Sequence, residues 1–127
     1  MKPLNKVQKS HEFGDFAEEI AAQEYMRKGY VVLERNWRSG KTEIDIIAQK
    51  EDTVIIIEVK ARNGRGEDAL SAVTTDKRKR MIRAADTYLK KLPGNLNYRF
   101  DIVTCTGTSE KYTLEILEDA FVSTDVF

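Results

Sequence analysis

Two apolar segments separated by three polar residues constrain this fold more than any other feature of the sequence. Residues 43–49 and 53–61 are rich in isoleucine and valine, and Lys50, Glu51 and Asp52 connect them. β-Branched residues favour strands, and a connection this short joins neighbouring strands only as an antiparallel hairpin. The sequence therefore predicts a sheet that contains this hairpin.

Helices and further strands are predicted on both sides of the hairpin. Residues 11–28 and 76–92 carry apolar side chains at three- and four-residue steps, which is typical of amphipathic helices. Thr74 or Thr75 is expected to cap the second helix, and Gly29 to end the first. Additional strands are expected at residues 30–33, 98–104 and 112–117, and a turn at residues 36–41. Because a helix separates the third strand from the fourth, we expect an α/β fold with a mixed sheet of about five strands flanked by helices.

Length and composition limit the class of protein. The 127 residues, 41% of them hydrophobic, support one core, so we expect a single domain over residues 1–127 with residues 1–10 as a flexible basic tail. We expect no signal peptide and no membrane span, and the single cysteine fits a reducing compartment, so the expected location is the cytoplasm. Lys and Arg total 21, as do Asp and Glu, which excludes binding to nucleic acid through bulk charge alone.

The charges are nevertheless segregated along the chain. Residues 10–59 contain eleven acidic and six basic side chains, whereas residues 60–91 contain four acidic and ten basic ones. A metal site beside a polyanion site would need an acidic block followed by a basic one. The pattern also arises by chance, so it carries weight only in combination with other features.

Strand alternation indicates which side chains share a face. Side chains point alternately to the two faces of a strand. On the third strand, one predicted face carries Val54, Ile56, Glu58, Lys60 and Arg62. On the second strand, Ile44, Ile46 and Ala48 are predicted to share one face, and Glu43, Asp45 and Ile47 the other.

The short connection sets Asp45 opposite Glu58, and Glu43 opposite Lys60. Facing carboxylates repel and weaken a sheet, and a divalent cation is the simplest way to offset the repulsion. Carboxylates without a neighbouring His or Cys suit Mg²⁺ or Mn²⁺. Lys60 could then hold the attacking water or contact the phosphate, as in phosphodiester hydrolysis; the alternative is a solvated sheet edge.

Several short motifs extend this interpretation. They are Gly14-x-x-Ala17-Glu18-x-x-Ala21, Gly29-Tyr30, Asn36-Trp37-Arg38, and residues 43–48 and 57–62. Together they resemble the YraN-like family of bacterial proteins, which is similar to Holliday junction resolvases and to the PD-(D/E)xK nucleases. The likeness covers roughly residues 11–104. Thr42 stands where many members have glycine, and Ile44 where the wider superfamily has proline; neither departure removes a ligand.

The resemblance implies a restriction-endonuclease-like core with a catalytic hairpin. By motif position, Asp45 and Glu58 would be metal ligands, Val59 would offer its backbone carbonyl, and Lys60 would be the catalytic lysine. Glu18 would be the additional acid on the first helix; its alternative is a solvated acid at the helix edge.

Basic residues outside the hairpin could hold a nucleic-acid backbone. Lys77, Arg80 and Arg83 lie in a basic run on the second helix, which could equally be its solvated face. Arg62 and Arg65 could form a phosphate-contacting loop or a plain turn.

We therefore expect a Mg²⁺- or Mn²⁺-dependent endonuclease acting on branched or damaged DNA, with a homodimer as an open option. The alternative is a non-catalytic nucleic-acid-binding module on the same scaffold.

Four other residues have simpler interpretations. Glu43 is expected to be an ordinary cross-strand partner of Lys60, and Trp37 to pack half-buried rather than to stack on a base. Cys105 is expected to be a small core residue. His11 is too isolated for a catalytic triad.

Overall fold

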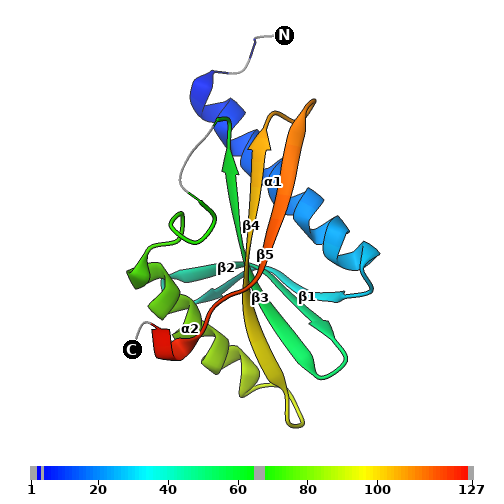
Figure 1. Ribbon diagram of the computed structural model, residues 1–127, viewed down its shortest axis with the longest axis vertical. Coiled ribbons are helices and arrows are strands. Elements are labelled where there is room, and N and C mark those ends of the chain that lie inside the picture. Colours follow the sequence, from blue (N-terminus) through cyan, green and yellow to red (C-terminus); the bar gives the residue numbers. More distant parts are fainter. Residues whose placement is uncertain (1–2, 4, 65–67, 126–127) are drawn as a thin grey trace.

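The computed structural model describes residues 3, 5–64 and 68–125, and its helices and strands follow the predicted order (Figure 1). The elements are helix α1 (Lys6–Arg27), strands β1 (Val31–Ser39), β2 (Thr42–Lys50) and β3 (Thr53–Arg62), helix α2 (Thr75–Leu89), strands β4 (Asn97–Gly107) and β5 (Tyr112–Phe121), and a 3-10 helix η1 (Ser123–Asp125). Within these residues, one five-stranded sheet has the order β1-β2-β3-β4-β5. Strands β3 and β4 pair in parallel, and the other neighbours are antiparallel. The predicted α/β class, with a mixed sheet flanked by helices, is confirmed and is consistent with a restriction-endonuclease-like core.

Each helix covers one face of the sheet (Figure 1). The face toward α2 buries Val54, Ile56 and Phe100 against Met81 and Tyr88 of that helix. The face toward α1 buries a second set: Ile46, Ala48, Ile55, Ile57 and Val103 against Ala21, Ala22 and Tyr25. No helix in the described part of the chain is long and apolar enough to cross a membrane.

Helix α1 begins five residues earlier than expected. The Asn5 side chain accepts a hydrogen bond from the backbone of Gln8, whose own side chain accepts one from the backbone of Asn5. Such a capping box stabilises the first turn of a helix without any apolar stripe. Helix α1 therefore includes residues 6–10, which were expected to belong to a flexible tail.

Strand β1 is longer than expected. Residues 36–39, predicted to begin a turn, continue the strand and pair with β2 as far as Ser39 and Thr42. The turn is confined to Gly40 and Lys41, with Gly40 at φ 60°. Two-residue hairpin turns of this kind favour glycine because a side chain there is strained.

Strands β2 and β3 separate where the charged residues begin. The predicted register is confirmed from Lys50–Thr53 to Ile46–Ile57, and the ladder ends there. Strand β3 continues beside β4, while β2 continues beside β1, so that the two strands diverge as a fork (Figure 1). The alternation in β2 also breaks at this point. Ile44 packs on the α2 side, whereas Ile46 and Ala48 pack on the α1 side, which corrects their predicted common face.

Candidate functional site

Asp45 and Glu58 stand at the base of the fork between β2 and β3. Instead of continuing the ladder, the Asp45 carboxylate accepts a hydrogen bond from the Val59 backbone N–H at 2.8 Å. The Asp45 and Glu58 carboxyl groups lie within hydrogen-bonding reach of each other, and Glu58 is only 6% exposed. Burial, and then the Glu58 carboxyl, raise the pKa of Asp45, while the Val59 N–H and Lys77 oppose that shift. A carboxyl pair of this kind, with Glu58 buried and Asp45 half-buried, favours a proton or a cation between its members.

Lys77 supplies a cation to this pair from helix α2. Its Nζ lies 3.3 Å from Glu58 Oε2 and donates to the Glu43 backbone carbonyl at 3.2 Å. Thr74 caps the helix one turn before it, as predicted, by accepting from the Lys77 backbone N–H. The sequence placed Lys77 among residues that could contact DNA, whereas the structure turns its side chain toward the acidic pair.

A signal for this placement was present in the helix pattern. Lys77 precedes buried Met81, Ala85 and Tyr88 at steps of three and four residues, so it extends the apolar stripe that faces the sheet. Because Lys77 lies within a run of basic residues, it was interpreted with that run as part of the solvated face of the helix.

A second group of side chains joins helix α1 to β1 and β2. The Asn36 side-chain amide donates to Glu18 Oε1 at 2.8 Å and to Glu43 Oε1 at 3.0 Å. Burial raises the pKa of Glu18, and Asp45 adds to the shift. Glu18 is thus brought to the same end of the fork as Asp45, through an asparagine to which the sequence assigned no role. The φ of 50° at Asn36 is a backbone conformation that asparagine tolerates better than most residues.

The expected pairing of Glu43 with Lys60 is wrong. Glu43 forms an ion pair with Arg38, its neighbour across the β1–β2 ladder, at 3.0 Å. The β2–β3 ladder ends before Glu43 and Lys60 could face each other. Lys60 is half-buried, and among the described residues its ammonium has no hydrogen-bond or ion-pair partner. It lies two residues beyond Glu58 on the same face of β3 and is available to a ligand.

The donor set at the fork suits a hard divalent ion. Within the described residues, no three His, Cys, Asp or Glu side chains already converge as a metal-binding group. Mg²⁺ is commonly held by one or two carboxylates and several waters, and Asp45 and Glu58 provide two adjacent carboxylates. Their chemistry, with oxygen donors and no thiol or imidazole, fits Mg²⁺ or Mn²⁺.

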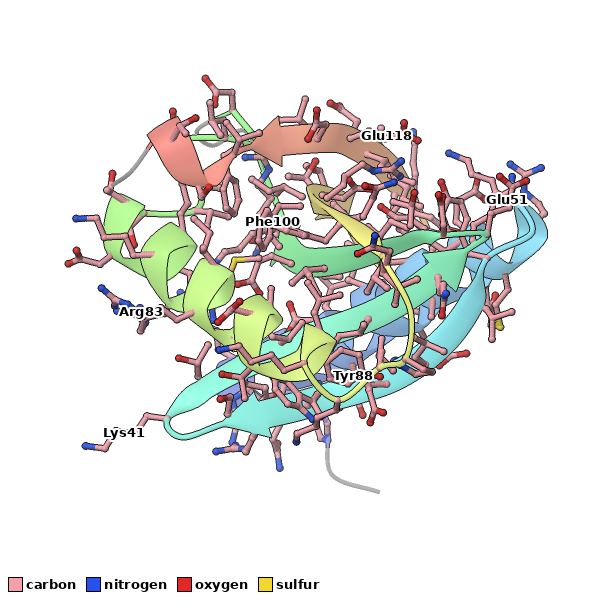
Figure 2. All side chains as sticks on the ribbon, turned by 90° about the horizontal axis from the view of Figure 1, so that it is seen from below. Lys41, Glu51, Arg83, Tyr88, Phe100 and Glu118 are labelled. Carbon is pink, nitrogen blue, oxygen red and sulfur yellow. The ribbon has the colours of Figure 1, made fainter. Side chains whose placement is uncertain are left out.

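The remaining predicted DNA-contacting residues are dispersed. Arg62, at the end of β3, donates through Nε to Thr106 on β4 at 3.1 Å. Arg80 and Arg83 are exposed on α2, and Figure 2 shows Arg83 on the outer side of that helix. Arg65 lies outside the described residues. The structure thus places Arg80 and Arg83 on the solvent side of α2 and Lys77 on the side of the acidic pair.

Three simpler interpretations agree with the structure. Trp37 is half-buried and packs edge-on against Tyr88, with ring centroids 5.1 Å apart. Cys105 is fully buried in the core. His11 is exposed on α1. None of the three adds a catalytic group to the fork.

Comparison with known proteins gives one consistent family. The model of the uncharacterised protein family UPF0102 matches residues 17–105. A UPF0102 protein of Phocaeicola vulgatus is 44% identical over 112 residues, which cover 87% of this chain and 93% of that protein. A UPF0102 protein of Nitratidesulfovibrio vulgaris is 38% identical over 121 residues, which cover 94% of this chain and 90% of the relative. In agreement with its resemblance to YraN-like proteins, the chain belongs to the uncharacterised protein family UPF0102.

Proposed function

We propose that this protein is a metal-dependent endonuclease that hydrolyses phosphodiesters in DNA, with branched or damaged DNA as its substrate class. The observation that carries the proposal is the contact between Asp45 and Glu58 at a fork in the sheet, with Lys60 on the same face two residues further along. Two adjacent carboxylates followed by a lysine that has no partner among the described residues suit the attack of water on a phosphodiester.

Each residue of the site has a separate role in this proposal. Asp45 and Glu58 would hold Mg²⁺ or Mn²⁺, with Glu18 and the Val59 carbonyl as further oxygen donors. When bound, the ion would stabilise negative charge on the phosphate and lower the pKa of a bound water. Lys60 would orient the attacking water or the phosphate, because its ammonium is not engaged elsewhere in the described structure.

The basic residues would position the DNA. Arg62 extends from the strand that carries Glu58 and Lys60, and exposed Arg80 and Arg83 lie on the helix that also carries Lys77. Contacts to phosphate require positive charge within reach and supply affinity and orientation rather than sequence specificity. We also propose that the protein acts in the cytoplasm, and that it acts as a homodimer, which would match a two-fold-symmetric DNA junction.

The test is cleavage of labelled single-stranded, duplex, flap and four-way-junction DNA with Mg²⁺, Mn²⁺ or EDTA. The wild type should cut at least one of these substrates with metal and none with EDTA. Asp45→Ala and Glu58→Ala should lose cleavage, whereas Asp86→Asn, which changes an exposed acid on α2, should retain it. Metal-dependent cleavage by both alanine variants would contradict the assignment.

A non-catalytic DNA-binding module is the second candidate, and one observation favours it. Lys77 forms an ion pair with Glu58 and so gives the acidic pair a counter-charge from the protein itself, as it would in a scaffold that has lost catalysis. This candidate predicts DNA binding that weakens with salt, no turnover, and a salt dependence reduced by about one charge for Arg83→Ala. Titrations of labelled DNA between low and moderate salt, run beside the cleavage panel, separate the two functions.

A further inference from the structure

We infer that Lys77 is a built-in counter-ion of the Asp45–Glu58 pair, which a divalent ion must displace in order to bind. The inference rests on the proposed metal site and assigns a mechanism that controls metal affinity there. Lys77 would therefore be a positioning residue, acting through the carboxylates rather than on the substrate.

The first support is where the Lys77 ammonium lies. It contacts Glu58 Oε2 at 3.3 Å and the Glu43 carbonyl at 3.2 Å, so it bridges the two strands on either side of the fork. It also acts electrostatically on Asp45, whose carboxyl is in reach of Glu58. A single positive charge thus interacts electrostatically with both carboxylates of the pair.

The second support is that the ammonium and a metal ion would need the same oxygens. Mg²⁺ and Mn²⁺ bind carboxylate oxygens directly, and Glu58 is buried, which limits the directions from which its carboxylate can be approached. A divalent ion beside the ammonium would bring like charges close together in a partly buried site, where solvent screens their repulsion weakly. The two cations therefore compete.

The third support is that Lys77 has a route out of the fork. Its backbone is fixed in the first turn of α2, but its side chain is 23% exposed and ends in a flexible four-carbon stem. Lys60 differs, since its ammonium has no partner among the described residues and need not be moved. The site thus contains one lysine that must move when metal binds and one that is already available.

Calorimetric titration with Mn²⁺ in the absence of DNA tests the inference. Lys77→Met removes the charge and keeps much of the aliphatic stem, so Mn²⁺ should bind at least about tenfold more tightly than to the wild type. Lys90→Met is the matched control. Lys90 lies at the C-terminal end of α2 and also pairs with an acid, Asp86, but this pair is exposed to solvent. That control should bind Mn²⁺ as the wild type does, and Asp45→Asn should bind it weakly or not at all.

Acetylation of the wild type by acetic anhydride supplies a second measurement that does not depend on the folding of a variant. Saturating Mn²⁺ should increase the labelling of Lys77 several-fold, measured by mass spectrometry relative to Lys90. Unchanged or weaker Mn²⁺ binding by folded Lys77→Met, or Lys77 labelling that does not rise with bound Mn²⁺, would overturn the inference but leave the proposed metal site standing. Wild-type protein that binds no Mn²⁺, or Asp45→Asn that binds it equally well, would overturn both.

Discussion

Replacing Asp45 with asparagine should stabilise the metal-free protein at neutral pH, although Asp45 is central to the proposed site. Asparagine keeps an oxygen that can accept the hydrogen bond from the Val59 N–H. It removes the negative charge that lies half-buried beside Glu58 and that the Val59 N–H and Lys77 offset only in part. A residue retained for chemistry rather than for folding is expected to behave in this way.

The size and pH dependence of the effect follow from the raised pKa of Asp45. In the unfolded chain an aspartate has a pKa of about 3.9, and each unit by which folding raises it corresponds to about 1.4 kcal/mol. Because the folded state binds the proton more tightly, the wild type loses stability as the pH rises from the unfolded value through the folded one. The raised pKa already includes the opposing effects of Lys77 and the Val59 N–H. Asparagine is still a polar side chain at this half-buried position and keeps part of the burial cost, so we expect Asp45→Asn to gain about 1–2 kcal/mol at pH 8, less than the full cost of the charge. The gain should largely disappear at pH 4.

Urea unfolding in EDTA at pH 4, 6 and 8 measures this difference directly. At pH 8 the variant should also melt about 4–8 °C higher than the wild type. Asp86→Asn is the control, since it changes an exposed acid that is paired with Lys90, and it should show no such gain. An Asp45→Asn protein that is less stable than the wild type at pH 8, or equally stabilised at pH 4 and pH 8, would refute the reasoning.

Three further predictions concern the scaffold, and urea unfolding at pH 7 checks each of them. Asp101 is fully buried and accepts hydrogen bonds from the Tyr25 hydroxyl, the Arg99 guanidinium and the Asp119 N–H. Asp101→Ala should therefore lower the free energy of unfolding by about 3 kcal/mol or more. A loss below about 1 kcal/mol would contradict this role. Gly107 has φ 126°, and a Cβ there would collide with the Lys111 carbonyl. Gly107→Ala should therefore lower the free energy of unfolding by about 2 kcal/mol. An unchanged free energy would contradict this and show that the β4–β5 turn adapts. Thr74→Ala removes the cap of α2 and should lower the free energy of unfolding by about 1 kcal/mol, whereas Thr74→Ser should lower it much less. Equal losses in the two variants would exclude capping as the cause.

The hairpin and its acidic pair could be predicted because they depend on short-range rules. A short connection, which the structure narrows to Glu51 and Asp52, fixes the register of β2 and β3, and the register brings Asp45 and Glu58 to the same level. The divergence of the strands at that level could not be predicted in this way. It depends on the end of β2 pairing with β1 and the end of β3 pairing with β4, and the β3–β4 pairing joins distant parts of the chain.

The roles of Lys77 and Asn36 also depend on tertiary structure. Whether a lysine at the start of a helix meets water or an acid is decided by where the helix packs, and α2 packs with its first turn beside the fork. Asn36, which is eighteen positions beyond Glu18 in the sequence, meets it because α1 crosses the face of β1. Residue type and spacing indicated the chemistry of this site, whereas the counter-ion and the bridging amide emerged only from the packing of the helices on the sheet.

The position of a bound divalent ion tests the central claim most directly. Crystals soaked in Mn²⁺ and measured near the manganese absorption edge would show the ion by its anomalous scattering. The account predicts a peak between Asp45 and Glu58, on the order of 2 Å from an oxygen of each carboxylate, with the Lys77 ammonium moved away from Glu58. Saturating Mn²⁺ with no peak at the fork, and with Lys77 still paired to Glu58, would contradict a metal-dependent site.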